Sequence, residues 1–211
     1  MFHNGDSACF RIRPSRGKAV VEEFLGDVRP AFWVSDRFGA QMGWASTGHQ
    51  ACLAHLLRDV QYAIEAGDAA FAPAINDLLK QAGAIGRRRD RLKHSTLAAY
   101  AARLEGTLDR LLRIVPIGEQ GLKLLRTIKR FRQHLFVFVT HRDLPPTNNG
   151  SEQALRPCVV FRKVTHRFRS HRGASLYADV RSVFETARRR GIPVLRSIRL
   201  TLDGQPLPLS P

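Results

Sequence analysis

Residues 31–36 read Ala-Phe-Trp-Val-Ser-Asp, and this stretch decides the predicted fold class. The apolar run 31–34 is typical of a buried strand, which ends just before Asp36. A segment of alternating apolar and polar residues, 8–13, predicts an earlier strand, and apolar residues at helical spacing over 17–26 predict a helix between the two. A strand, a helix and a second strand form a parallel pair, so the chain is predicted to be an α/β protein.

The chain after this sheet region is predicted to be mostly helical. Apolar residues recur at intervals of three and four, which indicates helices over 53–64, 71–81, 92–115 and 119–133. The apolar run 135–139 fits either a continued helix or a strand, because periodicity does not distinguish them over five residues.

A rigid loop with two prolines, 141–149, separates the helical middle from the last part of the chain. A helix is predicted to start with Asn149 as its N-cap and Glu152 at the third position, and to end by Pro157. Two more helices are predicted over 173–191 and 194–202.

Four regions follow from these element predictions. They are a partial sheet region (1–65), a helical insertion (66–134), a region of helices (135–202) and an extended, mobile tail (203–211).

Composition excludes several classes of protein. The chain has 211 residues, of which 44% are hydrophobic, which is enough for a folded core without disulfides. Three widely spaced cysteines do not form a disulfide framework and favour a reducing compartment. No apolar run reaches the length of a membrane span, and the first residues lack the features of a signal peptide. A cytoplasmic protein without a membrane partner is expected.

The formal net charge of +16 points to a polyanionic partner. Residues 156–199 hold eleven Arg and one Lys against two acids, and smaller basic clusters lie at 87–93 and 123–132. Because Arg binds phosphate oxygens in pairs, these clusters favour binding to the nucleic-acid backbone. A solvated surface remains the alternative for each cluster taken alone.

Two acids are candidates for chemistry, although each also has a structural explanation. Asp36 follows a predicted strand, where ligands gather in α/β sheets, but it also fits a helix cap. Glu152 fits the acid of a capping box. The spacing of His49, Cys52 and His55 would suit zinc on one helical face, yet no fourth ligand is evident, and a structural role or one beside the active site is preferred.

Several longer sequence motifs resemble those of a known family. The chain is similar to transposases of the insertion-sequence sixty-six family from about residue 10 to residue 202. The Asn-Asn-x-x-Glu word at 148–152 and its Arg-rich sequel are specific. The words that carry the resemblance are Val-Ser-Asp-Arg-Phe-Gly-Ala-Gln at 34–41, His-Gln-Ala-Cys-Leu-Ala-His-Leu-Leu-Arg-Asp at 49–59, Pro-Pro-Thr-Asn-Asn-Gly-Ser-Glu-Gln-Ala-Leu-Arg-Pro at 145–157 and Phe-Arg-Lys at 161–163.

This resemblance implies an RNase H-like catalytic fold, here truncated, with a predominantly helical insertion and a helical C-terminal part. It also implies three acids that hold two divalent ions, Mg²⁺ or Mn²⁺, for DNA strand cleavage and transfer. Asp36 matches the second Asp of the family and Glu152 matches its Glu. Carboxylate oxygens suit such hard cations, and a pair of them can activate the attacking group and stabilise the leaving oxygen.

The same resemblance suggests which residues contact DNA. Phosphate contacts are expected from the basic residues after Glu152, and DNA or loop contacts from two asparagines, although Asn149 also serves as a simple cap. The residues expected to contact DNA are Arg156, Arg162, Lys163, Arg167, Arg169, Asn148 and Asn149.

The first Asp of the family should lie on an earlier strand, and this chain begins too late to contain it. Asp6 is the only earlier acid, and its turn-like context with no strand before it makes it a poor substitute. The chain is therefore expected to be the C-terminal part of a transposase and inactive alone. One alternative is a non-catalytic DNA-binding remnant or a regulator of an intact transposase. Another is that an upstream-encoded polypeptide supplies the Asp, since unpaired sheet edges invite partners.

Overall fold

The computed structural model describes residues 1–209 and shows a mixed α/β protein that is mostly helical. Its contacts divide the chain into two compact units. The middle unit is Gly17–Asn148, and the terminal unit joins Met1–Arg16 to the chain from Asn149 onward. Over residues 1–209, no helix is both long enough and apolar enough to cross a membrane.

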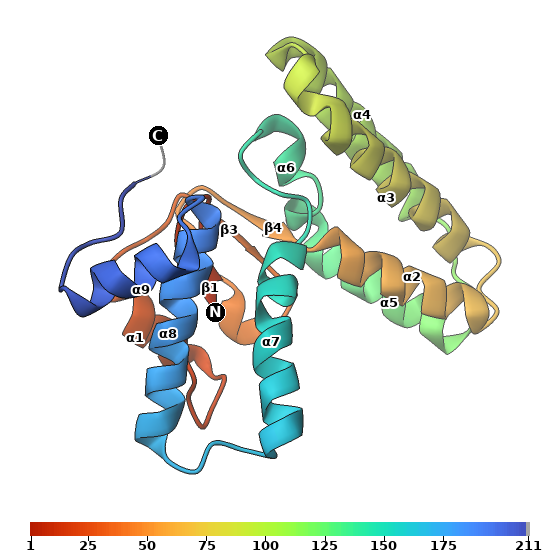
Figure 1. Cartoon of the computed structure of the whole chain (residues 1–211). Coiled ribbons are helices and arrows are strands. Elements are labelled where there is room, and N and C mark those ends of the chain that lie inside the picture. Colours follow the sequence, from red (N-terminus) through yellow and green to blue (C-terminus); the bar gives the residue numbers. More distant parts are fainter. Residues whose placement is uncertain (210–211) are drawn as a thin grey trace. The chain divides into compact units, whose positions relative to one another are not determined.

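The middle unit begins with a short helix and two strands and continues with helices (Figure 1). In chain order its elements are α1 (Lys18–Leu25), β3 (Phe32–Ser35), the 3-10 turn η1 (Gly39–Gln41), β4 (Gly48–Ala51), α2 (Leu53–Glu65), α3 (Phe71–Arg88), η2 (Arg89–Arg91), α4 (His94–Leu111), α5 (Gly118–Phe131), η3 (Arg132–His134) and α6 (Val137–Thr140).

β3 and β4 pair in parallel, with Phe32 opposite Gly48 and Ser35 opposite Ala51. Residues 36–47 form the crossover, which has about the dozen residues that a parallel connection needs. In segment 8–13, the predicted partner of β3, only Ala8–Cys9 form a strand, and this strand pairs with β1, so that prediction is wrong. β3 is also less buried than predicted, because the described residues add no strand beside it other than β4.

Helices α2–α5 pack around the main apolar core, which includes Leu56, Phe71, Leu104 and Ile128. Apolar side chains at every third or fourth position give each helix one buried face. Figure 1 shows α2 beside α5 and α3 beside α4. The four predicted helices are confirmed, although α3 continues to Arg88, beyond the predicted end at residue 81.

A buried carboxylate, Asp68, starts α3. It accepts hydrogen bonds from the backbone N–H groups of Ala70 and Phe71, each at 3.1 Å, and from that of Ala72 at 3.2 Å. The first N–H groups of a helix have no partner inside the helix, and a negative charge there is also favoured by the helix dipole. Asp68 additionally accepts the N–H of Ile117 at 3.2 Å, which ties the start of α5 to the start of α3.

Two polar side chains join the helices to the strands. Gln50 of β4 donates to the carbonyl oxygen of Leu135 at 3.0 Å and accepts the N–H of Phe138 at 3.1 Å. The buried guanidinium of Arg89 donates to the carbonyl oxygens of Phe138 and Leu144, both at 2.7 Å. These bonds satisfy buried backbone groups, so they fix the path of the segment that leads to the proline loop. The run 135–139, left open between helix and strand, lies partly in α6.

The terminal unit contains β1 (Phe2–His3), β2 (Ala8–Cys9), α7 (Asn149–Thr165), α8 (His171–Arg189) and α9 (Val194–Leu202). β1 and β2 form an antiparallel hairpin. The hydroxyl of Thr186 accepts the N–H of Ala8 at 3.1 Å, and the hydroxyl of Ser182 accepts the N–H of Phe10 at 2.8 Å. Side chains of α8 therefore satisfy the backbone of the β2 segment.

The predicted end of α7 at Pro157 is wrong, because the helix continues to Thr165. A proline inside a helix removes one hydrogen bond and costs about 3 kcal/mol. Leu155 and Cys158, on either side of Pro157, pack against a cluster that contains Phe10, and this packing opposes a break. The start also differs by one residue, because Asn149 is the first residue of the helix and not the residue before it.

The last segment is predicted as an extended, mobile tail over residues 203–211. Residues 210 and 211 lie outside the described part of the chain. Before them, Arg190 donates to the carbonyl oxygens of Leu207 at 2.9 Å and Pro208 at 3.2 Å. These bonds connect the segment to the end of α8.

Candidate functional site

Asp36 directly follows β3, at the carboxyl end of a parallel strand. Its Oδ1 atom accepts the backbone N–H of Phe38 at 3.1 Å, and this bond holds the carboxylate in a turn. The side chain is half-buried. Within residues 1–209 no hydrogen bond or ion pair engages its other oxygen, so Asp36 has one oxygen available for a ligand.

The strands position the backbone of Asp36 through a short chain of hydrogen bonds. The Ser35 hydroxyl donates to the carbonyl oxygen of Asp36 at 2.5 Å, and it lies 3.0 Å from Nε2 of His49. Because the hydroxyl proton is already used, Nε2 of His49 must be the donor to Ser35. His49 is 5% exposed, and burial, followed by the nearby His134, lowers its pKa to about 4. His49 is therefore neutral at pH 7.

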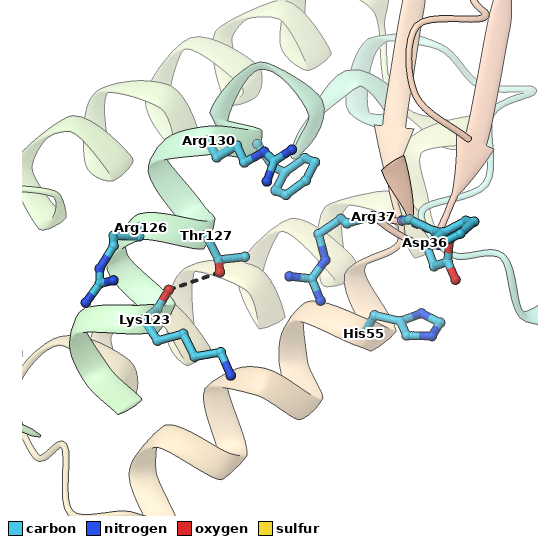
Figure 2. Close-up of a pocket in the computed structure, with 9 residues that line it drawn as sticks. Asp36, Arg37, His55, Lys123, Arg126, Thr127 and Arg130 are labelled. Atoms are coloured by element: carbon cyan, nitrogen blue, oxygen red, sulfur yellow. Dashed lines mark hydrogen bonds between the residues drawn. The ribbon is translucent and has the colours of Figure 1, made fainter. Parts of the chain in front are cut away.

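A pocket with a volume of about 540 Å³ opens beside Asp36. Figure 2 shows that its two sides come from different elements: α5 forms one side, and the segment after β3 together with α2 forms the other. All of the lining residues belong to the middle unit. They are Asp36, Arg37, Phe38, His55, Lys123, Arg126, Thr127, Arg130 and Phe131.

Positive charge dominates the pocket, in which Asp36 is the only acid among the lining residues. Arg37 forms an ion pair with Asp59 on α2, at 2.5 Å between Nη2 and Oδ2. Lys123, Arg126 and Arg130 form no ion pair with any residue in the described range 1–209. The pocket is thus suited to an anion or to a metal ion that Asp36 binds together with an anion.

Glu152 lies in the terminal unit, in the first turn of α7. The N-terminal turn of this helix packs on the β1–β2 hairpin: a Cβ on Gly150 would meet the ring of His3 at 3.6 Å. One turn further on, Ala154 is buried against the cluster that contains Ala8, Phe10 and Ala178. This packing holds the first turns of α7, and with them Glu152, on the hairpin.

The basic residues predicted to contact DNA lie on α7 and on the turn after it, and all of them are exposed. None of these five forms an ion pair within the described residues. They are Arg156, Arg162, Lys163, Arg167 and Arg169. The two asparagines differ: Asn149 is exposed at the start of α7, whereas Asn148 belongs to the middle unit and donates its N–H to Cys52 Sγ at 3.4 Å.

The alternative of a zinc site on one helical face is not supported. His49 lies on β4 and Cys52 precedes α2, so only His55 lies on the helix. Cys52 accepts from Asn148 while His49 binds Ser35. Over residues 1–209, no three His, Cys, Asp or Glu side chains come together as a metal site. By themselves, then, the described residues do not form a complete divalent-metal centre.

Two other acids of the terminal unit are held by arginines. Glu185 is buried, and its hydrogen bonds with Arg188 lower its pKa. Asp6 lies 3.5 Å from Nη2 of Arg190. The expectation that no strand precedes Asp6 is wrong, because β1 does, and Asp6 lies in the turn between β1 and β2.

Sequence reasoning missed the pocket as a site. The helical repeat of basic residues over 123–132 was visible, but nothing in the sequence indicated that this face of α5 lies beside Asp36. Arg37, the residue next to Asp36, carries no sequence signal of its own that marks it as a pocket residue. The missing information was the packing of α5 on α2, which is a long-range contact.

Comparison with known proteins gives one finding. A family model described as "Transposase IS66 family" matches residues 2–176. No curated protein and no solved structure matches the chain.

Proposed function

This chain belongs to the IS66 family of transposases, and on that basis we propose that it acts in DNA transposition through a part of an RNase H-like catalytic site. The family match covers most of the chain and includes both Asp36 and Glu152. The observation that carries the proposal is the position of Asp36, at the carboxyl end of a parallel strand and on the edge of a cationic pocket. Parallel strands present ligand-binding groups at this end.

We further propose that Asp36 and Glu152 provide two of the carboxylates that bind Mg²⁺ or Mn²⁺. Both are acids with oxygen donors, which these cations prefer. The exposed arginines and lysine after Glu152 would bind phosphates of the DNA that is cleaved at this metal site. Further ligands are needed for a complete centre, because the described residues bring no three metal-binding side chains together.

The chain alone is therefore expected to lack strand-cleaving activity. The test is the nicking of supercoiled plasmid by the purified 211-residue protein with Mg²⁺ or Mn²⁺, beside the matched variants Asp36→Asn and Glu152→Gln. We expect no nicking above background from all three proteins. Nicking by the wild type that either substitution abolishes would contradict the expected inactivity and would identify these acids as catalytic.

A second candidate function is a non-catalytic DNA-binding protein that regulates an intact transposase. The exposed, unpaired basic residues of α7 favour DNA binding with or without catalysis. The two functions differ when the chain is added to an intact transposase of the family. A regulator changes strand transfer whether or not Glu152 is replaced by Gln, whereas a catalytic part acts only with Glu152 present.

A polypeptide that completes the site is the third proposal. β3 pairs with β4 alone within residues 1–209, and a sheet edge can accept a further strand. If a polypeptide carrying the first Asp is supplied, we expect a stable complex and cleavage that depends on Asp36. Size-exclusion chromatography of the mixture without a shifted peak would count against such a partner.

A further inference from the structure

We propose that the basic face of α5, together with Arg37, binds the sugar-phosphate backbone of duplex DNA beside Asp36. This inference rests on the proposed function, since it names how the pocket around Asp36 holds its substrate. It concerns the middle unit only. The contact is separate from the basic residues of α7, which belong to the terminal unit.

The spacing of the α5 residues places them on one side of the helix. Lys123, Arg126, Thr127 and Arg130 recur at intervals of three, one and three residues, and neighbours on a helix face lie three or four residues apart. The opposite side of α5 is buried in the core through Leu124 and Ile128 among others. Figure 2 shows Lys123, Thr127 and Arg130 on the side of α5 that faces Arg37 and His55, while the side chain of Arg126 extends away from them.

Convergence on one cavity distinguishes these cations from other exposed ones. Lys80, Arg103 and Arg113 are also exposed and without ion pairs in the described range, but they line neither the pocket beside Asp36 nor the pocket between residues 12–14 and 168–174. In the pocket, three cationic side chains without an ion pair in residues 1–209 (Lys123, Arg126 and Arg130) and Arg37, which is paired with Asp59, share the lining with a single acid. Such a group repels itself unless an anion lies between its members, so the pocket selects a negatively charged partner.

The length of the basic face favours a polymer of phosphates over a small anion. Lys123 and Arg130 are seven residues apart, which corresponds to about 10 Å along a helix axis. A single phosphate group is shorter than this face, so the face can contact more than one phosphate of a DNA strand. Arg126 and Arg130 supply the planar donors that match phosphate oxygens.

The test compares two triple variants of the full chain with equal loss of charge. Lys123→Gln, Arg126→Gln and Arg130→Gln remove the basic face, while Lys80→Gln, Arg103→Gln and Arg113→Gln remove one Lys and two Arg elsewhere. Binding to duplex DNA is measured by fluorescence anisotropy in EDTA from 50 to 200 mM salt. Each lost phosphate contact lowers the salt slope by about 0.9, so the slope of the first variant should fall by about 2 to 3.

At 100 mM salt we expect the basic-face variant to bind at least about tenfold more weakly than the control variant. Equal affinities and equal slopes for the two variants would overturn the proposal. Tighter binding of duplex RNA than of duplex DNA would also overturn the proposal, because it names DNA as the partner. Circular dichroism checks that both variants are folded, and because these residues are exposed, neither substitution removes core contacts.

A second variant of the same pocket should strengthen DNA binding, whereas the triple variant of the basic face should weaken it. Asp36→Asn removes the only acid in the cationic pocket and should raise DNA affinity in EDTA by about fivefold, because a negative charge near phosphate is repulsive. Unchanged or weaker binding would overturn the proposal. Since these measurements contain no metal, they are independent of nicking: failure of the proposed catalytic role leaves the binding result unchanged, and the converse also holds.

Discussion

At the scale of single residues, the site depends on a histidine that must stay neutral. His49 donates from Nε2 to Ser35, and Ser35 donates to the carbonyl oxygen of Asp36. Its other ring nitrogen, Nδ1, is buried and has no hydrogen-bond partner in the described structure. A proton added at Nδ1 would bury a positive charge near His134, so folding opposes protonation.

This pKa shift predicts a pH dependence of stability. The pKa of His49 is lowered from its ordinary 6.5 to about 4 in the folded protein. Between these values the unfolded chain binds more protons, so the free energy of unfolding falls as the pH drops from 6.5 to 4, by at most about 3 kcal/mol from this group.

Urea unfolding of the wild type and of His49→Gln at several pH values measures that contribution. The variant should lose less stability than the wild type between pH 6.5 and 4. His94→Gln, which changes an exposed histidine on α4, should keep the profile of the wild type. Parallel profiles for the wild type and His49→Gln would show that His49 does not titrate in this way.

At the scale of elements, two glycines of α3 differ in the space available for a side chain. Gly83 and Gly86 both lie inside the helix. A Cβ on Gly83 would meet only the end of Arg87, at 3.8 Å. A Cβ on Gly86 would lie 2.7 Å from the ring of Phe138, a fully buried side chain of α6. α6 therefore approaches α3 as closely as a glycine allows.

Two alanine substitutions should consequently have opposite effects. Gly83→Ala should raise the free energy of unfolding by about 0.5 to 1 kcal/mol, because alanine favours the helix more than glycine. Gly86→Ala should lower it by about 1 to 3 kcal/mol, because Phe138 must move. Thermal and urea unfolding measure both. Equal gains in stability from the two substitutions would contradict the close packing of α6 on α3.

The helices are predictable from local sequence patterns, whereas the strand pairing has no local signal in the sequence. Helices α2–α5 follow from apolar residues at regular intervals, a pattern that neighbouring residues carry by themselves. β4 reads Gly-His-Gln-Ala, which lacks β-branched residues, and only its pairing with β3 makes it a strand. The continuation of α7 through Pro157 also depends on tertiary packing, which overrides the local preference.

The candidate site was predictable in part for the same reason. Sequence motifs predict Asp36 and Glu152 as site residues, and the structure places Asp36 after β3 and Glu152 in the first turn of α7. The pocket was not predicted, because Arg37 and Arg130 are far apart in the sequence and meet only through the packing of α2 and α5. The charge pattern predicts a nucleic-acid partner but does not predict which surface binds it.

At the scale of the whole molecule, the charge of +16 is divided between two units. The terminal unit carries the exposed basic residues of α7, and the middle unit carries the basic face of α5. DNA affinity should therefore have two separable contributions, one from each unit. We expect the sugar-phosphate backbone of duplex DNA to lie against the pocket beside Asp36.

Photocrosslinking tests that claim most directly. A benzophenone amino acid is placed at Thr127, which lines the pocket, or at Val115, which is 79% exposed and does not line this pocket. Both proteins are irradiated with labelled duplex DNA in EDTA, at concentrations where each is saturated. We predict a strong crosslink from position 127 and little from position 115. DNA bound by both proteins but crosslinked no better from position 127 would contradict the account.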